Sequence, residues 1–360
     1  MNDTFQRLMA DATKLTRFGD LRAATAAIQA ALSGATAPTH AALDDATVIE
    51  GEAREIKDGH AVGNAETPAA GQFVNGTYTD KNGSRDYKLF IPTRAAKKPL
   101  PLVVMLHGCA QNPDDFALGT GMNDAAQAHG FLVLYPAQTQ NANASRCWNW
   151  FMRSHQQRDL GEPALLANMT LDVMAKYNVE RRRVYVCGLS AGGAMAAILG
   201  DTYPDVFAAV GVHSGLATGS ATDVQSAFAV MNSGVIAGNS GGSSGRIADN
   251  ASRHTPPTIV FHGDQDVTVN PANGVRVAAA SAAALTPEIE HGHSENGRKY
   301  TRHLYRESGG KVATEHWVVH GAAHAWSGGS ARGSYTDARG PSATDEMVRF
   351  FFAHTLKTKL

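Results

Sequence analysis

One serine of this chain has neighbours that could make it a nucleophile. Ser190 lies in the pentapeptide Gly188 to Gly192, after the apolar run Val184 to Cys187 and before an apolar stretch of helical character. A tight turn from a strand into a helix lifts a serine hydroxyl out of a sheet, and glycine on both sides leaves room for that turn. The chemistry that such a turn serves is attack on a carbonyl carbon.

The same Gly-x-Ser-x-Gly pattern occurs around Ser240 and again around Ser243. Both lie in a Gly/Ser-rich stretch with no strand before it, which is typical of a flexible loop. The sequence context therefore favours Ser190. The competing interpretation is a Gly-rich turn without chemistry, and two further residues argue against it.

A serine hydroxyl needs a histidine to take its proton and a carboxylate to orient that histidine. The apolar run Thr258 to Phe261 leads into a loop with two acids, Asp264 and Asp266. We predict Asp266 as the orienting acid, because it stands three residues before Val269, which would pack back against the domain. Asp264 is the rival, and either carboxylate could instead cap a turn.

The predicted base is His324, which follows the last apolar strand expected in the chain. The chain has 15 histidines, so position decides among them, and His320 is the nearest competitor. The order Ser190, Asp266, His324 is that of α/β-hydrolases.

An oxyanion hole requires two backbone amides that point at the developing negative charge. One should belong to Ala191, directly after the serine, at the start of the following helix. The other should come from the loop after Val103 to Leu106, and we predict the amide of Cys109. The alternative for that loop is an ordinary turn from strand to helix.

Three tryptophans are candidates for the substrate site. Trp148 and Trp150 lie in an aromatic cluster, and Trp326 stands beside His324. A wall of the substrate site is one interpretation of the cluster and core packing is the other, whereas Trp326 has the better claim to the site. No Cys/His cluster has zinc-ligand spacing and no Gly-rich phosphate loop occurs, so we predict neither a metal nor an organic cofactor.

The elements that must position these residues alternate between strand and helix. Helical stretches are expected over 162–177 and 191–203, and Asp80 to Gly83 predicts a hairpin turn. Buried strands are expected at Leu100 to Leu106, Phe131 to Tyr135, Val184 to Cys187, Ala208 to Val212, Thr258 to Phe261 and His316 to Val319. Repeated units of this kind predict an α/β fold, a mostly parallel, doubly wound sheet with helices on both faces.

The catalytic domain is expected over residues 71–360, with a cap or lid-like insertion at 217–256. Residues 1–34 predict an N-terminal helical hairpin, and residues 35–70 predict a linker. We expect the hairpin not to be part of the catalytic core.

Composition excludes several functional classes. The 360 residues carry 32 basic and 33 acidic side chains, so no basic field suggests nucleic acid. No apolar run approaches the roughly 18 residues of a membrane span. The N-terminus lacks the features of a signal peptide, and three cysteines are too few for a disulfide framework. We therefore expect a cytoplasmic protein, with export by another route as the alternative, and the oligomeric state stays open.

Several motifs together resemble the poly(3-hydroxybutyrate) depolymerase family of esterases over about residues 70–356. They are Leu106 to Cys109, Cys147 to Phe151, Gly188 to Met195 and His324 to Gly329. The resemblance implies an α/β-hydrolase fold, the triad named above, and aromatic side chains around an ester site. It also implies that Cys109 and Cys147 are neighbours above the sheet, where they could form a disulfide under oxidising conditions.

The function that these observations predict is hydrolysis of poly(3-hydroxybutyrate)-type polyesters or their oligomers by a serine carboxylesterase, through an acyl-enzyme. A feruloyl or acetylxylan esterase is the alternative with the same catalytic residues. A granule-associated binding protein is the alternative of another class.

Overall fold

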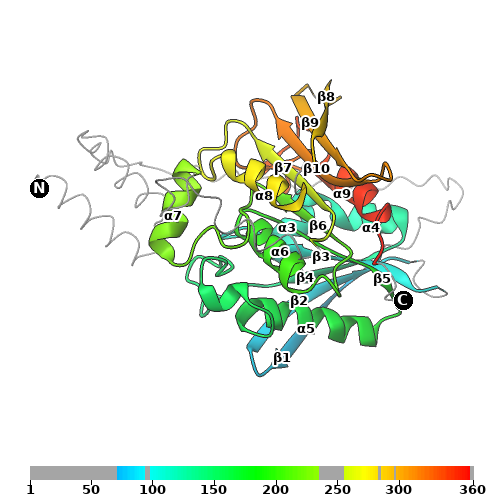
Figure 1. The fold of residues 1–360 in the computed structure, drawn as a ribbon. Helices are drawn as coiled ribbons and strands as arrows, with labels where there is room; N and C mark the ends of the chain where they lie inside the picture. The colour runs from blue at the N-terminus through cyan, green and yellow to red at the C-terminus, as the bar shows by residue number, and fades with distance from the viewer. Residues whose placement is uncertain (1–70, 94–97, 235–254, 283–284, 296, 357–360) are drawn as a thin grey trace, which may run out of the picture. The chain divides into compact units, whose positions relative to one another are not determined.

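A central sheet of ten strands positions everything else in the described part of the chain (Figure 1). The computed structural model describes residues 71–93, 98–234, 255–282, 285–295 and 297–356, which belong to one compact unit, Ala65–Leu360. The predicted hairpin (1–34) and linker (35–70) lie outside the described residues. So do Ser240 and Ser243, with the rest of 235–254.

The order of strands across the sheet is β1-β2-β4-β3-β5-β6-β7-β10-β9-β8. Strands β4, β3, β5, β6, β7 and β10 run parallel to one another, while β1, β2, β9 and β8 add antiparallel edges. In chain order the strands are β1 (Gln72–Asp80), β2 (Gly83–Ile91), β3 (Leu100–Leu106), β4 (Leu132–Pro136), β5 (Val179–Leu189), β6 (Ala209–His213), β7 (Thr258–Gly263), β8 (Pro287–His293), β9 (Lys299–Arg306) and β10 (Val312–Val319).

Helices lie on both faces of the sheet, as the sequence predicts. The helical elements are α3 (Pro113–Thr120), α4 (Met122–His129), η1 (Arg153–Gln156), α5 (Gly161–Lys176), α6 (Ala191–Thr202), α7 (Val224–Ser233), α8 (Ala272–Ala282) and α9 (Ala343–Phe352). Side chains alternate along each strand, so β3 sends Leu102 and Val104 into one core and Val103 and Met105 into the other. The first core is filled from α5, α6 and α8, and the second from α3, α4 and α9. The fold is an α/β-hydrolase fold.

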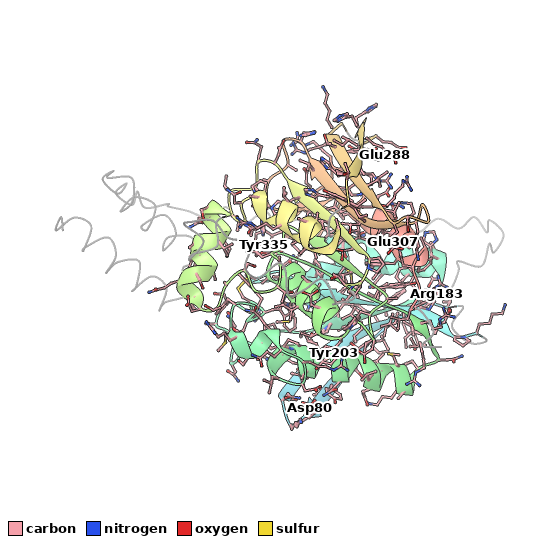
Figure 2. The ribbon with its side chains drawn as sticks, viewed as in Figure 1. Asp80, Arg183, Tyr203, Glu288, Glu307 and Tyr335 are labelled. Carbon is pink, nitrogen blue, oxygen red and sulfur yellow. A yellow bond between two sulfur atoms is a disulfide. The ribbon has the colours of Figure 1, made fainter. Side chains whose placement is uncertain are left out.

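The predicted hairpin turn lies between β1 and β2, where Asp80 pairs with Gly83. The Asp80 carboxylate accepts the amide of Asn82 at 2.7 Å, and Gly83 has a φ of +132°, which a side chain would disfavour. Figure 2 labels Asp80 at this turn and Glu288 on β8, which mark the two opposite ends of the sheet.

Strands β8 and β9 were not among the strands expected from the sequence. These strands pair antiparallel beyond β10, and Leu304 is their only residue in the buried hydrophobic core of the described chain. Charged residues such as Glu288, Arg302 and Arg306 alternate along them and form ion pairs across the sheet surface. An edge of this kind carries no apolar run by which a sequence analysis could find it.

The parallel strands end at a common edge, and the candidate site residues follow these ends. Ser190 comes directly after β5, Asp266 follows β7, and His324 follows β10, while the loop that contains Cys109 follows β3. Loops at the carboxyl ends of parallel strands are the usual place of a functional site in open α/β sheets. Among the described residues, no helix has the length and apolar character needed to cross a bilayer.

Candidate active site

Ser190 has the backbone geometry of a nucleophile elbow. Its φ of +59° and ψ of −119° form a strained conformation for a residue with a side chain. A Cβ on Gly188 would lie 2.5 Å from the carbonyl oxygen of Leu106, and a Cβ on Gly192 would lie 2.0 Å from that same oxygen. Both glycines are therefore required by the close approach of β3 to the turn.

The described structure brings His324 and Asp266 together. His324 Nδ1 donates to Asp266 Oδ2 at 2.7 Å, while Asp266 Oδ1 accepts the amides of Thr268 at 2.9 Å and Val269 at 2.8 Å. Burial raises the pKa of Asp266, but the donors around it outweigh burial and hold its pKa well below the usual range. The acid is therefore ionised at neutral pH. Because a carboxylate only accepts, the His324 proton lies on Nδ1 and leaves Nε2 free to act as a base.

The two rival residues pair with each other instead. Asp264 Oδ2 accepts from His320 Nδ1 at 2.8 Å, and Asp264 Oδ1 accepts the amide of Gly321 at 2.7 Å. This second pair links the loop after β7 to the loop after β10. Asp264 thus has a place in the site as a link between the two loops that carry Asp266 and His324.

The two predicted oxyanion donors have amides that no described acceptor takes. In the loop after β3, the amides of Gly108, Ala110 and Gln111 all donate to nearby acceptors. The amide of Cys109 has no acceptor among the described residues, and neither has that of Ala191, the first residue of α6. Amides left open at a helix start and in an adjacent loop are suited to bind an oxyanion.

A disulfide joins Cys109 to Cys147, across 38 residues of sequence and a Cα separation of 4.3 Å. The amide of Ala110 reinforces this link by donating to the carbonyl of Ser145 at 2.8 Å. The two cysteines are therefore neighbours, as the resemblance implied. The bond anchors the loop of Cys109, the predicted second oxyanion donor, to the segment that precedes Trp148.

The three tryptophans are buried in the described structure, with exposed fractions of 0% for Trp148, 5% for Trp150 and 1% for Trp326. Trp148 Nε1 donates to the carbonyl of His107 at 3.1 Å. Trp326 stacks on His213, and its Nε1 donates to Thr344 at 3.1 Å. This burial favours the core-packing interpretation of Trp148 and Trp150, and it leaves little surface of any of the three for a substrate to contact.

A buried network that sequence reasoning missed supports the loop after β3. Glu162, at the start of α5, accepts from the amide of Asn149 at 2.7 Å and from the Gln138 side chain. The amide of Gln138 in turn donates to His107 Nε2 at 3.1 Å. Burial lowers the pKa of His107 to about 4, so the ring stays neutral and can accept this bond. Nothing in the spacing of these residues marks them, since their contacts span 13 to 31 positions of sequence.

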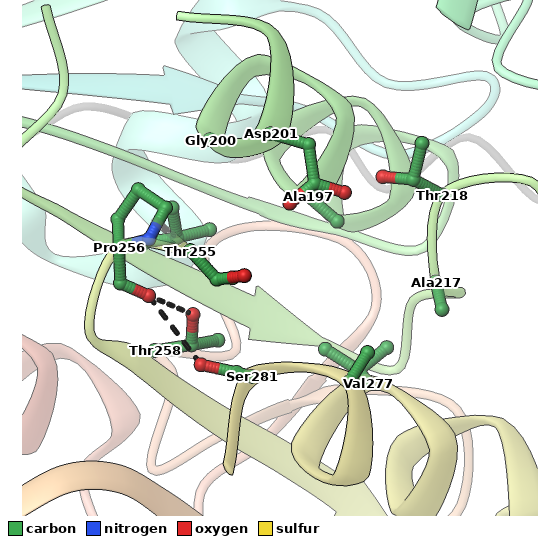
Figure 3. A pocket seen from close by; sticks show the side chains of 12 residues that line it. Ala197, Gly200, Asp201, Ala217, Thr218, Thr255, Pro256, Thr258, Val277 and Ser281 are labelled. Carbon is green, nitrogen blue, oxygen red and sulfur yellow. Dashed lines mark hydrogen bonds between the residues drawn. The ribbon is translucent and has the colours of Figure 1, made fainter. Parts of the chain in front are cut away.

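The cavity in Figure 3 is separate from the candidate catalytic residues. It is lined by side chains of α6, α8 and the segments around Ala217 and Pro256, and its volume is about 30 Å³. None of Ser190, Asp266 and His324 lines it. A space of that size holds about one water molecule and does not suit a substrate.

Comparison with known proteins finds relatives of this chain. The chain is 31% identical over 232 residues to poly(3-hydroxyalkanoate) depolymerase C of Paucimonas lemoignei, covering 62% of this chain and 54% of that protein. It is 30% identical over 250 residues to poly(3-hydroxybutyrate) depolymerase of Ralstonia pickettii, covering 66% and 50%. A probable acetylxylan esterase A of Neosartorya fischeri is 28% identical, covering 56% of each chain. The chain thus spans about half the length of these relatives.

Among solved structures, the acetyl xylan esterase from Aspergillus awamori superposes with a TM-score of 0.57 at 19% identity, covering 78% of this chain and 99% of that one. At this identity the likeness concerns the fold. The family model described as esterase PHB depolymerase matches residues 85–286, more than half of the sequence. The chain therefore belongs to the PHB depolymerase family of esterases.

Proposed function

We propose that this protein is a serine carboxylesterase that hydrolyses poly(3-hydroxybutyrate)-type polyesters or their oligomers. The observation that carries the proposal is the 2.7 Å bond between His324 and Asp266, at the sheet edge where Ser190 occupies a strained elbow. An ionised acid, a histidine with a free Nε2 and an elbow serine are the parts of a catalytic triad. The names of the two depolymerase relatives support the class of substrate.

In the proposed reaction, His324 Nε2 takes the hydroxyl proton of Ser190, and the serine oxygen attacks the ester carbonyl carbon. The amides of Ala191 and Cys109 stabilise the negative oxygen of the tetrahedral intermediate. His324 then gives the proton to the departing alcohol, which leaves an acyl-enzyme. A water molecule, deprotonated by His324, hydrolyses that ester and restores Ser190. Asp266 stays ionised throughout and stabilises the imidazolium form of His324.

Acetylated xylan or a feruloyl ester is the second candidate substrate, because acetylxylan and feruloyl esterases are also relatives of the chain. A hydrolysis panel separates the candidates. It compares hydroxybutyrate oligomers and polymer with methyl ferulate, acetylated xylan and short p-nitrophenyl esters, using Ser190→Ala as the blank. We expect the highest kcat/KM on hydroxybutyrate oligomers. A preference for acetylated xylan or methyl ferulate would replace the proposed substrate and keep the chemistry, whereas no hydrolysis of any ester would contradict both.

A further inference from the structure

A second histidine lies against the acid of the triad. His262, in β7, is buried with an exposed fraction of 1%. Its Nε2 lies 2.8 Å from the carbonyl oxygen of Val269 and 3.4 Å from Asp266 Oδ2. Since both neighbours are acceptors, Nε2 carries the proton and points it between them.

The other ring nitrogen of His262 fixes this assignment. Nδ1 is buried and has no hydrogen-bond partner among the described residues. It faces Gly274 of α8, where a Cβ would lie only 2.6 Å away. A proton on Nδ1 would therefore be buried without an acceptor, which is unfavourable. In the neutral ring the one proton therefore lies on Nε2, directed at the acid.

The environment of Asp266 shows what this proton does. Oδ1 accepts two backbone amides, those of Thr268 and Val269. Oδ2 faces two imidazoles, His324 at 2.7 Å and His262 at 3.4 Å. A carboxylate has about four acceptor positions, so His262 completes the set and removes the freedom of the carboxylate to rotate away from His324.

We propose that His262 is a positioning residue of the triad, whose Nε2–H, held between Val269 O and Asp266 Oδ2, fixes the carboxylate that orients His324. This inference rests on the proposed function. His262 acts through Asp266 and touches no reacting atom.

The proton on His262 Nε2 also affects the charge that His324 meets. The Nε2–H of His262 compensates part of the negative charge on Oδ2, and this makes Asp266 a weaker partner for the imidazolium form of His324. Removal of that proton leaves the carboxylate uncompensated, which favours the charged form of its neighbour and should displace the acid limb of the rate profile to higher pH. Other titratable groups near His262 are His213 on β6 and His316 on β10. Arg276 is the charged residue of α8, the helix that packs on β7.

The test compares His262→Leu with His262→Gln, whose amide can place an N–H near the position of Nε2. The matched control is His316→Leu, which removes another buried histidine with an unpartnered ring nitrogen but no contact with the triad. We expect His262→Leu to lower kcat/KM on p-nitrophenyl acetate about tenfold or more and to move its acid limb to higher pH. His262→Gln should recover most of the rate, and His316→Leu should leave both quantities close to those of the unsubstituted enzyme.

A second readout needs no turnover. The proton signal of the His324 Nδ1–H, which donates to Asp266, is followed by NMR in the full chain at neutral pH and should shift in His262→Leu and not in His316→Leu. Gly274→Ala, which displaces the His262 ring, should shift this signal as well. An unchanged signal in a folded His262→Leu, or an equal change in His316→Leu, would overturn the inference. If the unsubstituted protein hydrolysed no ester while the signal still shifted, the proposed function would fail and the positioning contact would stand.

Discussion

The backbone amide of Ser190 donates to the carbonyl oxygen of His213 at 2.8 Å. The ring of the same histidine accepts the amide of Ser327 at Nε2, at 2.9 Å, three residues past His324. Burial, together with His262 and His324, holds the pKa of His213 well below its ordinary value, so Nε2 stays an acceptor. One neutral side chain of β6 thus links the turn that carries Ser190 to the loop that carries His324.

The triad assignment predicts a specific order of losses. Ser190→Ala and His324→Ala should each reduce ester hydrolysis by roughly 10³-fold or more, because these residues act as a unit. Asp266→Asn should cost less than Ser190→Ala but far more than Asp264→Asn, which disturbs the contacts of Asp264 with His320 and Gly321. Steady-state kinetics on one soluble ester ranks the four variants. If Asp264→Asn proved to be the more damaged of the two, Asp266 would not be the orienting acid.

Gly192→Ala should inactivate the enzyme even though alanine favours helices. Its Cβ would lie 2.0 Å from the carbonyl oxygen of Leu106 and 2.6 Å from that of His107, so the loop after β3 would have to move. A 1 Å displacement of an oxyanion donor can cost on the order of 10²-fold in rate. Gly309→Ala is the control, because a Cβ there meets nothing within 4 Å. Equal kcat/KM values for the two variants would contradict the close approach.

His316 should make the folded state sensitive to acid. Burial lowers its pKa to about 3, below the value near 6.5 expected for the unfolded chain. The unfolded state therefore binds a proton that the folded state does not, and stability is lost as pH falls from about 6.5 toward 3. The loss is about 1.4 kcal/mol per pH unit for this one group.

Urea denaturation at pH 7, 6 and 5 measures that slope. In His316→Gln, the free energy of unfolding should fall less steeply with acidification. Its slope against pH should be smaller by about 1.4 kcal/mol per pH unit, which is the contribution of one proton. His293→Gln, at an exposed position of β8, is the matched control and should keep the original slope. Parallel slopes for all three proteins would show that His316 is not buried in its neutral form.

The disulfide should stabilise the fold and the oxyanion loop. Replacing both Cys109 and Cys147 by alanine opens a link across 38 residues, which the chain-entropy argument values at about 3–4 kcal/mol of unfolding free energy. Cys187 is the internal control, since it is free and buried, and burial raises the pKa of its thiol. Alkylation of the folded protein should label Cys109 and Cys147 only after reduction, and Cys187 in neither state. Labelling of Cys109 without reductant would show a reduced pair, as expected of a cytoplasmic protein.

Much of the fold could be predicted from the sequence because the parallel strands are apolar. The expected strand over Leu100 to Leu106 has those bounds in the structure, and α6 follows Ser190 as expected. Other boundaries differ because polar residues extend the strands, as in β5, which begins at Val179 although Arg181 and Arg182 are exposed. The charged edge strands β8 and β9 left no apolar signal at all.

The site could be predicted where chain order and local turns determine it. Asp266 follows β7 closely, and its distance from His324 reflects the pairing of β7 with β10. The roles of Trp326, Glu162 and His262 could not be predicted, because they depend on side chains that meet across the core. A tryptophan beside a catalytic histidine can face the substrate or the interior, and only packing decides between the two.

Labelling with a fluorophosphonate probe, mapped by mass spectrometry of peptides from the full chain, tests the central claim most directly. Such probes react with a serine that a histidine activates, so the claim needs no knowledge of the substrate. We predict a single modified serine, Ser190, with labelling abolished in His324→Ala and retained in His320→Ala. Modification at Ser240 or Ser243 instead, or no modification of the folded protein, would contradict the assignment of Ser190 as an activated nucleophile.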